Sequence, residues 1–218
     1  MRRLALALAV LLLPAGADAE EQAVGPATCP AERAIYELRA PDTQEVWRLA
    51  FVPARHMASI ASDLYLKLTT PQRDYWFTFS VSQGYSGISV FPVTDPYAQG
   101  GPRDLLGSPY GDNAEAEHTA EIAGSLRFLS FDPDLNVAFV PPMAGEDAPQ
   151  FIMMPDIGLT LWYEASALTD DARADRDPMP RGIFRLAHCL DAPHPLAGPG
   201  KVGLEFPDGD GDDEAAGP

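Results

Sequence analysis

Residues 63–93 read DLYLKLTTPQRDYWFTFSVSQGYSGISVFPV, and this stretch decides the fold class. Large apolar residues alternate with smaller or polar ones in three runs, which are Leu64, Leu66 and Leu68, then Tyr75, Phe77, Phe79 and Val81, then Ile88 and Val90. A period of two residues is typical of a strand with one buried face. Turn-forming residues separate the runs at Thr70-Pro71 and at Ser82-Gln83-Gly84. The stretch therefore predicts a meander of three antiparallel strands.

Short strands are also predicted on both sides of this meander. The same alternation, interrupted by turn-forming residues, recurs over residues 45–52, 125–131, 135–140, 151–154, 158–165 and 181–190. About nine or ten short strands predict an all-β domain, either an antiparallel β-sandwich or an irregular barrel. Residues 94–119 are rich in Gly, Pro and Asp, which predicts a long loop that holds a short helix over residues 112–123.

Two segments leave helix and strand open. Residues 30–40, PAERAIYELRA, alternate as a strand does, whereas their Ala, Glu, Arg and Leu content favours a helix. The strand predicted directly after them favours the strand interpretation. Residues 55–61 place apolar residues at helical spacing just before Leu64. If both segments are helical, the domain is α+β rather than all-β.

Residues 1–19 have the layout of a secretory signal peptide. A basic start at Arg2-Arg3 precedes an apolar run over residues 4–13, and Ala17-Asp18-Ala19 has the small-x-small form of a cleavage site. The apolar run is about half as long as a membrane span requires. We therefore expect export with cleavage after Ala19, and no membrane span in the mature protein.

The charge balance disfavours several classes of partner. The chain carries 15 Lys and Arg against 32 Asp and Glu, a formal net charge of −17. Without a basic patch, binding to nucleic acid or to an anionic membrane surface is disfavoured. Arg outnumbers Lys, and Ala is abundant, which favours a GC-rich bacterial source. We therefore expect a periplasmic or secreted protein whose partner is a protein or carbohydrate of the cell envelope.

One β domain is expected over residues 29–190. Residues 20–28 have the composition of a disordered leader, and residues 191–218 that of a Pro/Gly-rich, acidic, disordered tail. Cys29 and Cys189 are the only cysteines of the chain. Two cysteines in an oxidising compartment predict a disulfide, which would join the first and last elements of the domain.

No motif for catalysis, for a metal or for a cofactor is complete. The acidic tail begins like an EF-hand loop at Asp208, but Asp213 stands where that loop requires glycine. Residues 107–111, GSPYG, have the letters of a nucleophile elbow, but Pro109 removes the backbone N–H that should follow the serine. The sequence therefore assigns no catalytic, metal-binding or cofactor-binding residue.

Three tyrosines in Gly-rich loops are the candidates for ligand contacts: Tyr85, Tyr97 and Tyr110. Loop tyrosines are common in surfaces that bind sugars or peptides, and they are as common in ordinary loop packing. The first functional hypothesis is a non-catalytic, exported binding or accessory module that uses the loops at 83–87 and 94–119. The alternatives are a hydrolase of envelope polysaccharides or esters, and a structural subunit that assembles by pairing an edge strand.

Overall fold

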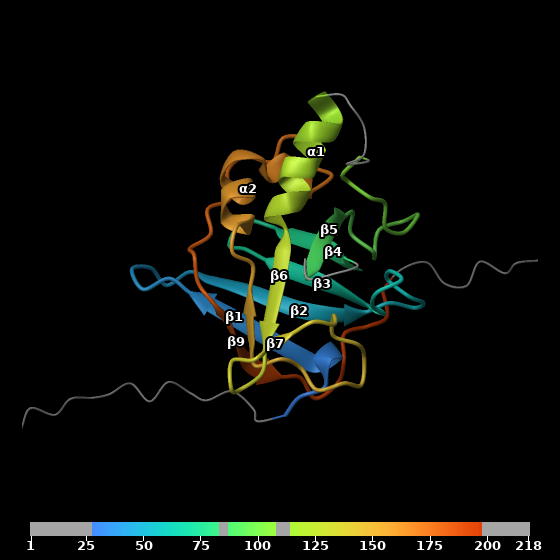
Figure 1. Ribbon diagram of the computed structural model, residues 1–218, viewed down its shortest axis with the longest axis vertical. Coiled ribbons are helices and arrows are strands. Elements are labelled where there is room, and N and C mark those ends of the chain that lie inside the picture. The colour runs from blue at the N-terminus through green and yellow to red at the C-terminus, as the bar shows by residue number, and fades with distance from the viewer. Residues whose placement is uncertain (1–27, 83–86, 108–113, 198–218) are drawn as a thin grey trace, which may run out of the picture.

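The computed structural model describes residues 28–82, 87–107 and 114–197, shown in colour in Figure 1. The expected signal peptide, residues 20–27 of the expected leader and residues 198–218 of the expected tail lie outside this described part. The described residues form one nine-stranded antiparallel sheet, two α-helices and two 3-10 helices. In chain order the elements are η1 (Ala31–Arg33), β1 (Ala34–Arg39), β2 (Val46–Pro53), β3 (Leu64–Thr69), β4 (Asp74–Val81), β5 (Ile88–Val93), α1 (Ala114–Ser125), β6 (Arg127–Phe131), β7 (Val137–Ala138), β8 (Phe151–Met153), α2 (Ile157–Tyr163), η2 (Ala165–Leu168) and β9 (Phe184–Cys189).

The strand pairings return to their starting point. The sheet order runs β5-β4-β3-β2-β1-β9-β8-β6, and β5 also pairs with β6 through two residue pairs. Eight strands thus close into an antiparallel barrel, and β7 is added as a ninth strand on β6. The all-β prediction is confirmed, and the pairings lend no support to the β-sandwich. The predicted meander is β3, β4 and β5, and the expected turn at Thr70-Pro71 joins β3 to β4, whereas residues 83–86 of the second expected turn lie outside the described residues.

The alternating side chains of the meander divide between two apolar clusters. Inside the barrel lie the residues of the predicted buried face except Val81, which is 44% exposed at the end of β4, and they join Trp47, Leu49 and Phe51 of β2. Phe51 packs edge-on against Tyr36 and Phe128, which links β1, β2 and β6 through aromatic contacts. On the outer face a smaller cluster forms around Trp76, where the chain that follows β9 covers the sheet. The period-two pattern therefore predicts the buried face of the meander correctly except at Val81, where β4 ends.

Two helices close one end of the barrel, which we call the helical end (Figure 1). The prediction of a strand over residues 158–165 is wrong, because Ile157–Tyr163 form the helix α2. Its buried residues, Ile157, Thr160 and Leu161, have the spacing i, i+3, i+4 that places them on one helical face. The expected short helix in the long loop is confirmed as α1, whose Ile122 reaches the barrel core.

Three further segments test the sequence interpretation. The open choice for residues 30–40 resolves into one 3-10 turn followed by β1, so the favoured strand is confirmed. Residues 55–61 form bends without a helix, so the helical turn expected there is wrong. The strand expected over residues 135–140 pairs only at Val137–Ala138. Among the described residues, no helix is long and apolar enough to cross a membrane.

The predicted disulfide between Cys29 and Cys189 is present, with a Cα–Cα distance of 5.7 Å. It joins the residue two positions before η1 to the last residue of β9. The chain then crosses the outside of the barrel, where the Ala197 N–H donates to Pro53 O at 2.8 Å. Residues 191–197, which the sequence groups with the tail, therefore lie against the barrel.

Candidate functional site

Of the three tyrosines expected to contact a ligand, only Tyr97 lies within the described residues. Its side chain is 47% exposed, and its hydroxyl donates a hydrogen bond to Pro195 O at 2.6 Å. Its ring packs edge-on against Trp76 at a centroid distance of 5.7 Å. Tyr97 therefore fastens the chain after β9 to the barrel wall, which is a structural use of both its ring and its hydroxyl. Tyr85 and Tyr110 lie outside the described residues.

A small cavity of about 110 Å³ lies beside Trp76, lined by the carboxylates of Asp74, Asp95 and Asp170. The ammonium of Lys67 lies 2.8 Å from Asp74 Oδ2 and 5.2 Å from the centre of the Trp76 ring. A cation over an indole ring and beside a carboxylate is a favourable arrangement. The chain's own lysine already makes these two contacts, so this cavity is a weak candidate for a ligand site.

A buried carboxylate at the helical end has an equally structural role. Asp177 is fully buried and accepts hydrogen bonds from Thr70 Oγ1 at 2.6 Å and from Tyr75 Oη at 2.9 Å. Burial, together with the nearby Asp177 charge, raises the pKa of Tyr75, so its hydroxyl stays protonated as a donor. These bonds tie the loop before β9 to the turn between β3 and β4, below the surface of the molecule.

An exposed apolar surface lies at the end of the barrel opposite the helical end. It follows residues 135–142, whose sequence is LNVAFVPP. This segment contains no charged residue, and residues 133–140 are all exposed. The exposed fractions of its large apolar residues are 63% for Leu135, 40% for Val137, 65% for Phe139 and 68% for Val140. Single exposed apolar residues are ordinary, but four exposed apolar residues within six positions are typical of an interaction surface.

A tight turn presents this segment. Asp132 Oδ1 accepts hydrogen bonds from the backbone N–H groups of Asp134 and Asn136, both at 2.9 Å, while Oδ2 accepts one from Asn136 Nδ2 at 2.8 Å. These bonds, led by the one from the Asn136 side chain, lower the pKa of Asp132. Leu135 adopts a φ of 65°, in the left-handed region that L-residues with side chains of this size rarely occupy. The turn therefore holds an exposed leucine in a strained backbone conformation.

The strand β7 is the open edge of the sheet that the described residues form. Among the described residues, each of the other eight strands has two or three partners, whereas β7 pairs with β6 alone. An unpaired strand edge displays N–H and C=O groups that another chain can pair with. Proteins commonly place Lys, Pro or an inward charge at such an edge, but residues 135–140 carry none of these. The open edge and the exposed apolar segment therefore coincide.

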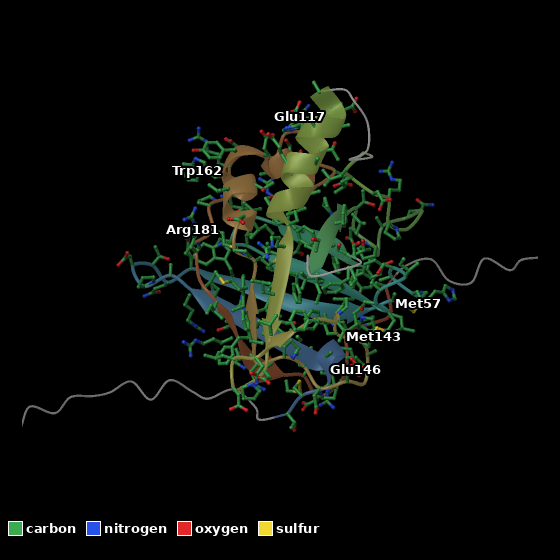
Figure 2. The ribbon with its side chains drawn as sticks, viewed as in Figure 1. Met57, Glu117, Met143, Glu146, Trp162 and Arg181 are labelled. Carbon is green, nitrogen blue, oxygen red and sulfur yellow. A yellow bond between two sulfur atoms is a disulfide. The ribbon has the colours of Figure 1, made fainter. Side chains whose placement is uncertain are left out.

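A groove with a volume of about 340 Å³ adjoins this edge. One side is formed by β6, its turn, β7 and the following residues, and the other by residues 146–150 with Thr28. The lining residues are Thr28, Ser130, Asp132, Pro133, Ala138, Val140, Pro141, Pro142, Glu146, Asp147, Ala148, Pro149 and Gln150. Figure 2 shows Met143 and Glu146 at this end of the barrel, far from Glu117 on α1. We call this groove, with the segment 135–140, the hairpin site.

The second side of the groove is held by the first described residues. The Ala148 N–H donates to Cys29 O at 2.7 Å, and the Ala31 N–H donates to Glu146 O at 2.8 Å. The Tyr36 hydroxyl donates to Pro149 O at 2.8 Å. Cys29 is in turn bonded covalently to β9. Residues 146–150 are therefore fixed to the barrel by backbone bonds on either side of the disulfide, and the groove is preformed.

Within the described part of the chain, the groove is lined by acidic side chains and by no basic one. Its lining includes Asp132, Glu146 and Asp147 but no Lys, Arg or His. Among the described residues, the ion pairs all involve other carboxylates, which are Glu37, Asp74, Glu164, Asp171 and Asp177. The hydrogen bonds that Asp132 accepts from described residues come from neutral donors, so they leave its negative charge in place. The groove therefore has a negative potential that favours positively charged groups.

The two faces of β7 differ in chemistry. Successive side chains of a strand point to opposite faces, and here Ala138 and Val140 line the groove whereas Val137 and Phe139 do not. One face of the edge thus meets the acidic groove, and the other presents Val137 and Phe139 as an apolar stripe. A ligand that lay along β7 would contact both faces at once.

The sequence pattern does not point to this site. It predicts one more strand over residues 135–140, and it favours ligand contacts at the tyrosine loops. The available signal was the absence of charge from residue 135 to residue 142 in a chain in which 22% of residues are charged. Among the described residues, no group of three or more His, Cys, Asp or Glu side chains is placed to hold a metal ion. Comparisons with family models, curated proteins and solved structures find no match to this chain.

Proposed function

We propose that this protein is an exported, non-catalytic binding module that receives an extended segment of a partner protein along β7. The observation that carries the proposal is the hairpin site, where the one singly paired strand of the described sheet bears an exposed apolar segment without charge. The proposal combines the binding-module hypothesis with the edge-pairing hypothesis, and it places the contacts at neither tyrosine loop.

Strand addition suits this geometry for a physical reason. An extended peptide that pairs with β7 satisfies main-chain N–H and C=O groups of the open edge, and its side chains meet those of the edge on both faces. Burial of Val137 and Phe139 by the partner adds a hydrophobic contribution of roughly 25 cal/mol for each Å² of apolar surface removed from water. The other eight strands stay paired, so binding requires no rearrangement of the barrel.

The proposed compartment follows from two features. Residues 1–19 have the layout of a signal peptide, and the disulfide suits an oxidising compartment such as the periplasm. A partner protein of the cell envelope would share that compartment. The carbohydrate-binding alternative has less support, because Tyr97, the described loop tyrosine, makes internal contacts.

The test is binding of a short, neutral peptide of alternating Thr and Val residues to the purified, oxidised protein, followed by fluorescence polarisation. The variant Val137→Lys introduces a charge at the edge, as natural edge strands do. Leu159→Lys is the matched control, because Leu159 is a similarly exposed apolar residue on α2 at the helical end. We expect Val137→Lys to weaken peptide binding by about tenfold or more, and Leu159→Lys to leave it unchanged.

Two results would overturn the proposal. One is peptide binding that Val137→Lys does not weaken, which would mean that the peptide does not pair with β7. The other is a concentration-dependent dimer of the wild-type protein that Val137→Lys dissociates, measured by sedimentation. In that case the edge would serve a second copy of this chain rather than a partner protein.

A further inference from the structure

We infer that the partner segment of the hairpin site is a two-faced strand, with basic residues on one face and apolar residues on the other. The inference rests on the proposed function and specifies the chemistry of the partner. It follows from the position of the acidic groove on one face of β7 and of the apolar stripe on the other.

The geometry of strand addition fixes which side chains reach the groove. A strand paired with β7 runs beside it at a spacing of about 4.8 Å, and its side chains alternate between the two faces of the sheet. Every second side chain therefore lies on the face of Ala138 and Val140, which line the groove. The remaining side chains lie on the face of Val137 and Phe139.

Electrostatics selects the residues on the groove face. Asp132, Glu146 and Asp147 line the groove without a basic residue among the lining side chains. A Lys or Arg of the partner strand is long enough to extend across the narrow β7 toward these carboxylates while its methylene groups lie over Ala138 and Val140. An acidic residue at the same position would be repelled by three like charges, so the groove also discriminates against acidic strands.

Hydrophobic contact selects the residues on the other face. Val137 and Phe139 are 40% and 65% exposed, which leaves apolar area for Val, Ile, Leu or aromatic side chains of the added strand. Cross-strand apolar pairs of this kind stabilise sheets through direct side-chain contact. Residues of the partner would thus alternate between basic and apolar, and a segment with the same composition in separate blocks would satisfy only one face at a time.

Four short peptides test this inference on the oxidised protein. They are alternating Lys-Val, alternating Thr-Val, alternating Glu-Val, and a peptide of the Lys-Val composition with its lysines and valines in separate blocks. We expect the alternating Lys-Val peptide to bind most tightly, the Thr-Val peptide to bind less tightly, and the Glu-Val peptide to bind least. The block peptide should bind less tightly than the alternating one, because a net charge of −17 alone cannot distinguish them.

Charge-neutral variants identify the carboxylates. The double variant Glu146→Gln/Asp147→Asn should weaken the Lys-Val peptide by about tenfold and leave the Thr-Val peptide unchanged, because each exposed ion pair contributes modestly. The matched control is Glu117→Gln/Glu121→Gln on α1, which removes the same charge from exposed positions at the helical end. The control should change Lys-Val affinity by less than about twofold.

The outcomes separate this inference from the proposed function. If the Thr-Val peptide binds and Val137→Lys abolishes its binding, but the Lys-Val peptide binds no more tightly, the partner chemistry is wrong while strand addition stands. Equal affinity of the block and alternating Lys-Val peptides overturns the two-faced strand. An equal effect of both double variants overturns the role of the groove, because net charge would then explain the preference. If no peptide depends on Val137, both proposals fail.

Discussion

Removal of the disulfide tests both the stability of the barrel and the integrity of the groove. Cys29 is fully buried, and its bond to Cys189 closes a loop between residues 160 positions apart. The Cys29 carbonyl also accepts the Ala148 N–H that holds the second side of the groove. The perturbation is the double variant Cys29→Ala/Cys189→Ala, which removes both sulfur atoms and leaves no unpaired thiol.

The expected magnitude follows from the length of the loop. For a separation of 160 residues, the chain-entropy relation gives a stabilisation of about 5 kcal/mol, which residual structure in the denatured state reduces. Single domains have unfolding free energies of about 5–15 kcal/mol in total. The double variant should therefore lose roughly 3–5 kcal/mol, and it should be folded only at low temperature or at low denaturant concentration.

The assay is urea unfolding of three samples: the oxidised wild type, the wild type reduced with a dithiol, and the double variant. Fluorescence and far-ultraviolet circular dichroism should give coincident transitions, and the reduced wild type should resemble the double variant. Under conditions in which the variant stays folded, its preference for the Lys-Val peptide over the Thr-Val peptide should diminish, because Glu146 and Asp147 lie on the loosened side of the groove. A loss of less than about 1 kcal/mol would refute this reasoning, because the loop would then be closed by other contacts.

Three further predictions concern single residues. Asp177→Ala should lower the free energy of unfolding by about 3 kcal/mol or more, because it leaves the buried Tyr75 hydroxyl without its acceptor. Asp177→Asn should lower it by less, and urea unfolding of both variants measures the difference. Burial and, to a lesser extent, the charge of Lys67 lower the pKa of His194. The folded state therefore favours the neutral imidazole, and the stability that this preference contributes is lost as the pH falls below about 6.5. His194→Gln should remove that part of the dependence, measured as the difference between two stability–pH curves from pH 7 to pH 5. Leu135→Asn should raise the thermal midpoint, by relief of about 1 kcal/mol of left-handed strain, and should weaken binding of the Thr-Val peptide.

The sequence predicts those strands of the barrel in which one face is buried and the other is not. In β3 and β4 the alternation is regular, and turn-forming residues such as Pro71 mark the ends of the strands. Which strands close the ring could not be predicted, because the β5–β6 contact joins Ile88 to Phe128 across the long loop and α1. Pairings between residues far apart in the chain leave no periodic signal in the sequence.

The helix α2 shows where the period of the apolar residues is ambiguous. Its sequence, IGLTLWY, is almost entirely apolar, and Thr, Trp and Tyr are residues that favour strands. A period of two and a period of 3.6 fit seven such residues about equally well. Packing against the barrel interior at the helical end favours the helix, because only a helix places Ile157, Thr160 and Leu161 on the same buried side.

The candidate site could be predicted only in its parts. The disulfide follows from two cysteines in a chain with the layout of an exported protein, and Asp132-Pro133-Asp134 are turn-forming residues. The groove was not predictable, because it forms where the hairpin meets residues 146–150, which are held in place by Cys29 and Ala31 at the other end of the chain. The composition of the tyrosine loops favours ligand contacts, but Tyr97, the loop tyrosine that the structure describes, packs against the barrel instead.

The carboxylates of the groove also explain how the protein can expose an apolar strand edge without associating through it. Asp132 and Asp134 precede the segment 135–142, and Glu146 and Asp147 follow it, so charges flank the uncharged run on both sides. Two copies of this chain that approached through β7 would bring these acidic groups together, and their repulsion opposes edge-to-edge association. A strand with a basic face meets the opposite condition, because the same charges then attract it. Solubility and selectivity would thus have one physical origin. Neutralising Glu146 and Asp147 should therefore weaken binding of basic strands and, at protein concentrations well above those of the peptide-binding assay, promote self-association through β7.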